Sequence, residues 1–124
     1  MKSTEIIDAN FILRYLLQDQ EQHFVQSKEV LENHEVFIPF EVCAEVVYVL
    51  EKVYQAPRTK IHQALDLLMA YPNVATIDKP VIRTALEVYR DRKIDFVDCM
   101  LIAYHRENGA VIHSFDKKIN QLCQ

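Results

Sequence analysis

Residues 5–17 read EIIDANFILRYLL, and they change from a strand pattern to a helix pattern at one acidic residue. Glu5-Ile6-Ile7 predicts a short strand, whereas the spacing of apolar residues from Phe11 to Leu17 predicts the buried face of a helix. Asp8 stands between the two patterns, and Asn10 is placed to cap the helix that follows. The chain is therefore predicted to begin with a strand that ends in an acid and leads into a helix.

The same alternation continues along the chain. Further strands are predicted at 35–38, 74–77 and 110–113, the last of them buried. Helices are predicted at 18–34, 39–55, 57–69, 78–91 and 95–108, followed by a short C-terminal helix. Pro39 and Pro57 are expected to open helices, and Gly109 is expected to end one in the left-handed conformation. Alternating strands and helices predict the α/β class, with a central parallel sheet covered by helices on both faces.

Composition restricts the possible functions. The 124 residues are expected to form a single domain, 1–124, and no repeat, linker-like tract or apolar run long enough for a membrane span is visible. No secretion signal is recognisable at the N-terminus, so a cytoplasmic location is expected. The net charge of −4 argues against a protein that coats nucleic acid. The three cysteines are isolated and are expected to be free thiols, and the histidine pattern does not suggest zinc.

Four acids lie in otherwise apolar stretches: Asp8, Glu45, Asp98 and Asp116. In open α/β sheets, ligands bind beyond the carboxyl ends of the strands where the strand order reverses. The predicted topology would bring these acids together there, where two carboxylates about 5 Å apart repel by roughly 3 kcal/mol. A divalent cation relieves that repulsion, and hard oxygen ligands favour Mg²⁺ or Mn²⁺. The pattern therefore indicates a metal site.

Each acid also has a simpler interpretation. Asp8 could cap the following helix, and Glu45 could belong to a polar stripe on its helix. Asp95 and Asp98 resemble a helix cap and its partner three residues later. Asp116 could be a turn acid or the cap of the last helix. Taken singly the acids indicate little, and the metal site depends on their order and their places in the predicted topology.

Four segments carry a resemblance to a known family: IIDANFILRYLL, IPFEVCAEVVYVLEKVY, IDFVDCMLIAY and IHSFDKKI. In order and spacing they resemble the PIN-domain ribonucleases, in particular the VapC-type toxins of toxin–antitoxin pairs. The resemblance spans nearly the whole chain. It implies a three-layer α/β/α sandwich on a parallel sheet and Mg²⁺- or Mn²⁺-dependent endonuclease cleavage of RNA. The bound metal would activate a water molecule and neutralise charge on the scissile phosphate.

The resemblance also implies roles for individual residues. The metal-binding and catalytic set would be Asp8, Glu45, Asp98 and Asp116. Supporting roles would fall to Asn10, Asp95 and Ser114. The chain departs from the family pattern at Ala9, where threonine is frequent, and at Cys99, where alanine is frequent. Neither departure removes an acid, so an active enzyme is expected.

RNA binding requires cations near the acids. Arg14 on the first helix is the preferred candidate, and the others are Arg58 with Lys60, residues 90–93, and Lys117-Lys118. For every one except Arg14, an ordinary solvated surface charge explains the residue at least as well. The resemblance further implies a homodimer and a small antitoxin partner. The apolar residues 46–50 could supply such an interface or belong to the core.

Two other functions remain open. The chain could be a catalytically silent PIN-like module that binds RNA or a protein, although none of its expected acids is altered. It could also be a different metal-dependent domain on a similar sheet, such as a flavodoxin-like receiver. A receiver needs paired acids on its first strand and a lysine after its last, and Glu5 with Asp8 does not make such a pair.

Overall fold

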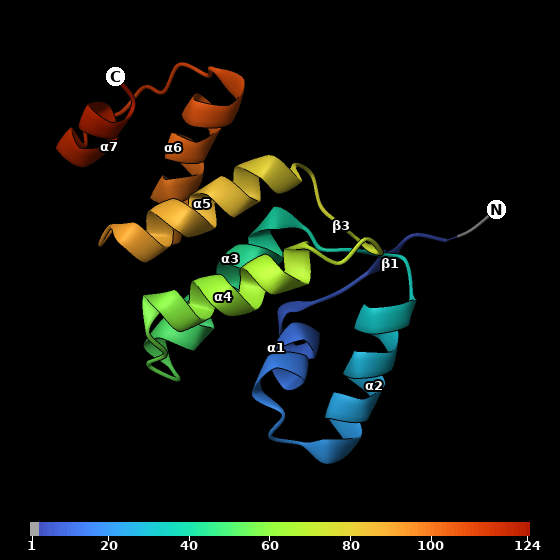
Figure 1. Cartoon of the computed structure of the whole chain (residues 1–124). Helices are drawn as coiled ribbons and strands as arrows, with labels where there is room; N and C mark the ends of the chain where they lie inside the picture. Colours follow the sequence, from blue (N-terminus) through green and yellow to red (C-terminus); the bar gives the residue numbers. More distant parts are fainter. Residues whose placement is uncertain (1–2) are drawn as a thin grey trace.

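The structure is a computed structural model of the chain, and it describes residues 3–124. It contains short strands and longer helices in the predicted alternation (Figure 1). In chain order the elements are β1 (Glu5–Ile6), α1 (Ala9–Leu17), α2 (Glu21–Asn33), β2 (Val36–Phe37), α3 (Phe40–Lys52), α4 (Arg58–Met69), β3 (Val74–Ala75), α5 (Lys79–Asp91), α6 (Phe96–Asn108) and α7 (Lys117–Leu122).

The three strands form a parallel sheet in the order β1-β2-β3, with Ile6 opposite Phe37 and Val36 opposite Val74. The parallel sheet and its helical connections confirm the predicted α/β class. Val36 and Val74 are buried on one face of the sheet, whereas the Ile6 side chain on the other face is 63% exposed. Within residues 3–124 the strands follow their order in the chain, so the reversal of strand order expected beside the site is not found.

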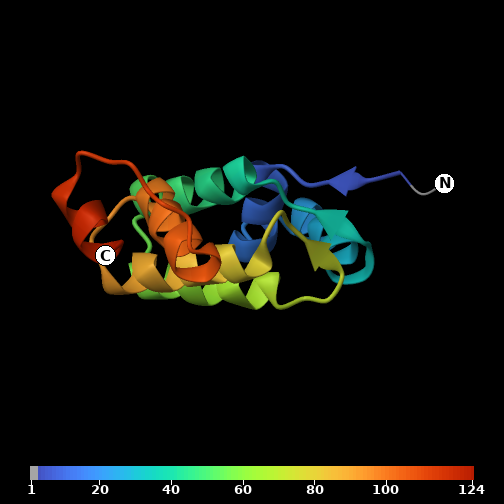
Figure 2. The ribbon, with the colours of Figure 1, turned by 90° about the horizontal axis from the view of Figure 1, so that it is seen from above.

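Most core residues belong to helices α3 to α6, which Figures 1 and 2 show packed together, and the core also includes Val36 and Val74 of the sheet. Helix α5 shows how the sequence builds it. The Asp78 carboxylate accepts a hydrogen bond from the Val81 N–H at 3.1 Å, and a proline stands in the first turn of the helix. Apolar residues at helical spacing then face the core, and Tyr89 meets the Phe96 ring of α6 edge to face, with centroids 6.0 Å apart. The N-terminal end of α6 thereby packs against the C-terminal part of α5.

The strand predicted at 110–113 is wrong, because these residues form no strand in the structure. Gly109 ends α6 with a φ of 68°, as expected, and the chain then runs as an exposed loop into α7. Val111 is 78% exposed and Phe115 is fully exposed. The apolar composition that predicted a buried strand is real. What is missing is a partner, because β1 and this loop lie toward opposite ends of the molecule in both views (Figures 1 and 2).

Other sequence-based expectations can be compared directly. Cys43, Cys99 and Cys123 are free, and the first two are buried. Burial raises the pKa of the Cys43 thiol to about 12, so this thiol is unreactive at neutral pH. In residues 46–50 most side chains belong to the core, whereas Tyr48 is exposed. Among the helices described for residues 3–124, none combines the length and the apolar character needed to cross a bilayer.

Candidate functional site

The N-terminus of α6 carries two of the predicted acids, Asp95 and Asp98. Asp98 is partly buried in the first turn, and its pKa is raised above the ordinary value for an aspartate. Burial is the largest cause, and the negative charges of Asp95 and Asp116 add to it. Asp95 occupies the N-cap position, as the capping interpretation requires, but its side chain accepts no capping hydrogen bond. The side chain of Asp95 is therefore available for another role.

Asp116 opens α7, the last helix. One of its carboxylate oxygens accepts hydrogen bonds from the N–H groups of Lys118 at 2.8 Å and Ile119 at 3.0 Å. The Ser114 hydroxyl accepts a hydrogen bond from the Asp116 N–H at 2.9 Å. The simpler interpretation of Asp116 as a helix cap is thus correct. Because Asp116 also acts on the pKa of Asp98, the cap lies within electrostatic reach of the α6 acids.

Asp8 follows β1 and caps α1, where its carboxylate accepts a hydrogen bond from the Phe11 N–H at 2.8 Å. The prediction that Asn10 caps this helix is wrong, because Asn10 lies inside the first turn of α1, with its side chain exposed. Asp8 is exposed at the carboxyl end of the sheet, which is the position predicted for it. A capping bond leaves a carboxylate with unused lone pairs, so capping does not exclude a further ligand at Asp8.

A cleft of about 440 Å³ separates α3 from the start of α6. Asp95 and Asp98 line one side, and Tyr48, Glu51 and Lys52 of α3 line the other. Lys52 pairs with Glu51, with a nitrogen–oxygen distance of 3.0 Å, and this contact is the main cause of its raised pKa. The charge of Asp95 also stabilises the Lys52 ammonium.

Tyr48 and Lys52 were not among the predicted site residues. Their signal in the sequence was the helical spacing that places them on the same face of α3 as Glu45. Glu45 is exposed on that face and does not line the cleft. The polar stripe is therefore real, and its C-terminal half faces the α6 acids.

The four predicted acids do not converge as expected. Within residues 3–124, no three side chains of Asp, Glu, His or Cys are grouped closely enough to hold one metal ion. The charges of Asp95 and Asp116 both raise the pKa of Asp98. Neither Asp8 nor Glu45 is among the charges that act on this pKa. The physical reason is the missing strand: residues 110–113 do not join the sheet, so Asp116 is not carried to the end of β1 beside Asp8.

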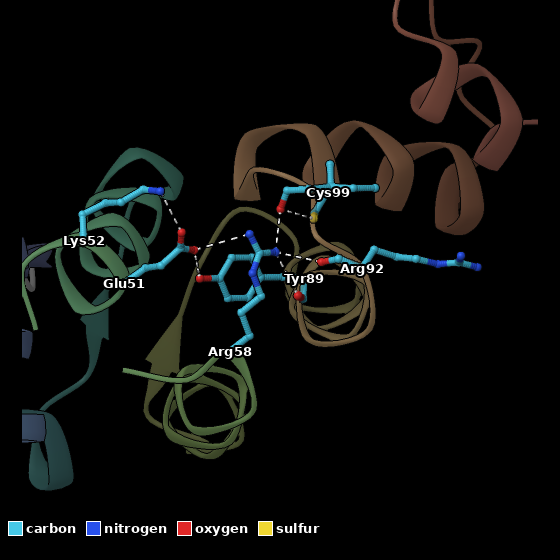
Figure 3. Close-up of polar contacts among 7 residues, drawn as sticks. Glu51, Lys52, Arg58, Tyr89, Arg92 and Cys99 are labelled. Carbon is cyan, nitrogen blue, oxygen red and sulfur yellow. Dashed lines mark hydrogen bonds and ion pairs between the residues drawn. The ribbon is translucent and has the colours of Figure 1, made fainter. Parts of the chain in front are cut away.

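An arginine fixes the segment that leads into α6 (Figure 3). The Arg58 Nη1 donates to the carbonyl oxygens of Tyr89 at 3.1 Å, Arg92 at 2.8 Å and Ile94 at 2.8 Å. The guanidinium also lies 4.1 Å from the Tyr89 ring centroid, and its Nη2 lies 3.5 Å from a Glu51 oxygen. The Tyr89 hydroxyl donates to the same carboxylate. Arg58 was a predicted RNA contact, but its donors are engaged inside the protein.

Arg14, the preferred RNA-binding candidate, is also engaged internally. Its side chain pairs with Asp19 at 2.7 Å and contacts the Tyr54 hydroxyl at 3.4 Å. Only 8% of Arg14 is exposed, and its Nε is buried without a hydrogen-bond partner among the described residues. The structure gives Arg14 a structural role and does not support RNA binding by it. Of the other candidates, Arg90 is partly buried, and the exposed ones are Lys60, Arg92, Lys93, Lys117 and Lys118.

Comparison with known proteins identifies the family of the chain. A family model described as PIN domain matches residues 6–124, nearly the whole chain. The chain belongs to the PIN-domain family. This PIN domain is 26% identical over 125 residues to the VapC ribonuclease of Aquifex aeolicus (strain VF5), and the alignment covers 95% of this chain and 91% of that protein. No solved structure matches it at a significant level. The resemblance found in the four sequence segments is thereby confirmed.

Proposed function

We propose that this PIN domain is a metal-dependent endoribonuclease and the toxin of a toxin–antitoxin pair. The family supports this function, as does the similarity to a protein named VapC ribonuclease. The observation that carries the proposal is the cleft between α3 and α6. There, Asp98 carries a raised pKa beside Asp95, opposite an exposed tyrosine and a lysine. Perturbed carboxylates in a cleft are typical of catalytic sites.

The walls of this cleft suit single-stranded RNA. Lys52 supplies a positive charge for a phosphate, and the exposed ring of Tyr48 supplies a surface on which a base can stack. One turn separates the two side chains on α3, so both can contact the same stretch of RNA. In this proposal Lys52 and Tyr48 replace Arg14 and Arg58 as the principal RNA contacts.

The proposed metal is Mg²⁺ or Mn²⁺, because the acids offer hard carboxylate oxygens. Within residues 3–124, no positively charged side chain is among the groups that shift the pKa of Asp98. Asp116 contributes to the raised pKa of Asp98, and the family pattern adds Asp8 and Glu45 as further ligands. The arrangement within one chain does not yet fit an ion, since no group of three such side chains is assembled among residues 3–124. A complete site therefore requires the segment that carries Asp116 to approach Asp8.

Cleavage of a defined single-stranded RNA tests the function. Purified protein is expected to cleave it with Mn²⁺ and to stop when excess chelator is added. Asp98→Asn should be folded and inactive. Asp95→Asn is the matched control, one helical turn away, and it should keep measurable activity. Cleavage that persists in chelator, or an active Asp98→Asn together with an inactive Asp95→Asn, would contradict the proposed site.

The proposed biological role is tested separately. A toxin of this kind is expected to be silenced by a small antitoxin protein. The expected result is that co-expression with the product of a short neighbouring reading frame blocks RNA cleavage and yields a stable complex. If the purified protein instead binds RNA without cleaving it under any metal condition, the catalytically silent module is the correct alternative.

A further inference from the structure

A small pocket of about 280 Å³ opens between the segment that joins α5 to α6 and the last helix, α7. The segment contributes Arg92, Lys93 and Ile94, and α7 contributes Lys118, Gln121 and Leu122. No acidic side chain of residues 3–124 lines this cavity. The fold thus gathers three cations from two separate elements around one cavity, which we call the basic pocket.

The three cations of the basic pocket take part in none of the ion pairs found within residues 3–124. The nearest acid in the chain, Asp91, is paired with Arg90 at 2.8 Å. The lowered pKa of Asp91 comes mainly from its hydrogen bond with Arg90, and the Arg92 charge contributes only a weaker attraction. Like charges held close together repel one another until an anion neutralises them, so the basic pocket suits an anionic group.

Both walls of the basic pocket are fixed from behind. Arg58 donates to the Arg92 carbonyl oxygen at 2.8 Å, and Figure 3 shows the Arg92 guanidinium extending away from this contact. On the other wall, the Lys118 N–H donates to the Asp116 carboxylate at 2.8 Å, and the buried Ile119 anchors α7. Because the backbone is already ordered on both sides, binding an anion orders side chains only, which lowers the entropic cost of binding.

The basic pocket adjoins the cleft between α3 and α6. Ile94 lines the pocket and Asp95 lines the cleft, so two neighbouring residues of the chain form walls of the two cavities. Asp98 also lines the cleft, and Asp116, two residues before Lys118, lies within electrostatic reach of Asp98. The proposed acids therefore stand next to both cavities, and a polymer that occupies one cavity can reach the other past these acids.

We propose that the basic pocket binds one backbone phosphate of the same RNA strand whose base stacks on Tyr48 in the cleft. The choice of RNA as the polymer rests on the proposed ribonuclease function. The planar guanidinium of Arg92 matches the geometry of a phosphate, and Lys93 and Lys118 add point charges. The Gln121 amide can donate a further hydrogen bond to a phosphate oxygen.

Two fixed points define the substrate more narrowly than a single cleft does. A base held in the cleft and a phosphate held in the basic pocket keep the linkage between them beside the proposed acids. The base must be unstacked to enter the cleft, which favours a single strand over a duplex. The substrate is therefore a single strand long enough to occupy both cavities, and shorter RNA that occupies only the cleft should bind more weakly.

RNA binding in the presence of chelator tests the basic pocket without using cleavage. The full chain is titrated into a fluorescent single-stranded RNA, and Kd is measured by anisotropy at several salt concentrations. Lys93→Gln/Lys118→Gln should raise Kd by about tenfold, which corresponds to about 1.4 kcal/mol. The double variant should also reduce the slope of log Kd against log salt by about 0.7, the contribution of one phosphate contact on a single strand.

Lys60→Gln/Lys117→Gln is the matched control. It removes the same charge from two lysines that are also exposed but do not line the basic pocket. Its Kd should stay within about twofold of the wild-type value, because exposed charges away from the contact add little. All four lysines are exposed, so both double variants should melt with the wild type. Equal losses of affinity in the two variants would show that net charge alone matters, and would overturn the proposal.

A scan of the RNA linkages tests whether a backbone phosphate is the occupant. Each phosphodiester of a short RNA is replaced in turn by an uncharged methylphosphonate. At one linkage the replacement should weaken binding to the wild type by about tenfold and to Lys93→Gln/Lys118→Gln by less than about twofold, because both changes remove the same contact. Inorganic phosphate, titrated against the backbone amide NMR signals, is the second arm. Shifts at Lys93 and Lys118 without any coupled linkage would assign the pocket to free phosphate and overturn RNA as its occupant.

The same measurements separate the basic pocket from the proposed function. If one linkage is coupled to Lys93 and Lys118 but the wild type cleaves no RNA with any metal, the ribonuclease function fails and the phosphate site stands. If the wild type cleaves RNA and no linkage is coupled, the function stands and the phosphate site is wrong.

Discussion

Replacing Arg58 should destabilise the protein more than any other surface-accessible substitution in α4. The Arg58 Nη1 carries two N–H groups, and they serve three carbonyl oxygens within 3.1 Å. A hydrogen bond from a charged donor contributes about 1.5–3 kcal/mol, and two donors set the limit at about 3–6 kcal/mol. The side chain is 22% exposed, so water replaces part of what is lost. We expect Arg58→Met to lower the free energy of unfolding by about 3 kcal/mol.

That loss is large against a typical total of about 5–15 kcal/mol and corresponds to a melting temperature lower by about 10 °C. Urea denaturation followed by circular dichroism measures it. Arg58→Lys keeps the charge but lacks the planar fork, so it should recover only part of the difference. Lys60→Met, at an exposed position on the same helix, serves as the control and should change stability by less than about 0.5 kcal/mol. A loss below about 1 kcal/mol for Arg58→Met would show that the carbonyl contacts do not hold the segment before α6.

Three further predictions concern the acids. Asp98 has a raised pKa, so ionising it destabilises the fold as pH rises through that pKa; in chelator, Asp98→Asn should therefore melt above the wild type at pH 7, and the gap should close below about pH 3.9, where aspartates are protonated in both states. Asp8→Ala should lose about 1 kcal/mol in urea denaturation through its bond to the Phe11 N–H, whereas Asp8→Asn keeps a capping side chain and should match the wild type. Asp95→Asn should have a free energy of unfolding within about 0.5 kcal/mol of the wild-type value, because the Asp95 side chain makes no capping bond; a larger loss would show an unrecognised contact.

The parts of the fold that were predictable from sequence depend on local patterns. Helix α5 has a capping aspartate, a proline in its first turn and apolar residues at helical spacing, and each acts over a few residues. Gly109 ends α6 for an equally local reason, since a left-handed residue favours glycine. The strand predicted at 110–113 was wrong because a strand also needs a neighbour, and alternation in the sequence does not specify where that neighbour lies.

The same distinction explains the basic residues. Arg14 was chosen as an RNA contact for its position on the first helix, yet it lies in an apolar run that faces the core and pairs with Asp19. Arg58 is bound by carbonyl oxygens from distant segments, and backbone acceptors leave no trace in a side-chain pattern. Lys52 became a site residue only when α3 and α6 were seen to share a cleft. Cations are easily counted in a sequence, but their partners are set by tertiary packing.

The acids show that a structural and a functional interpretation need not compete. Asp8 and Asp116 cap helices, and Asp98 lies in the first turn of α6, so all three stand at helix N-termini. The partial positive charge at a helix N-terminus stabilises a carboxylate there. It offsets part of the burial cost, and of the repulsion from Asp95 and Asp116, that together raise the pKa of Asp98. Helix starts can therefore keep several acids ionised at separate places in one fold, and capping is one of the means by which they do so.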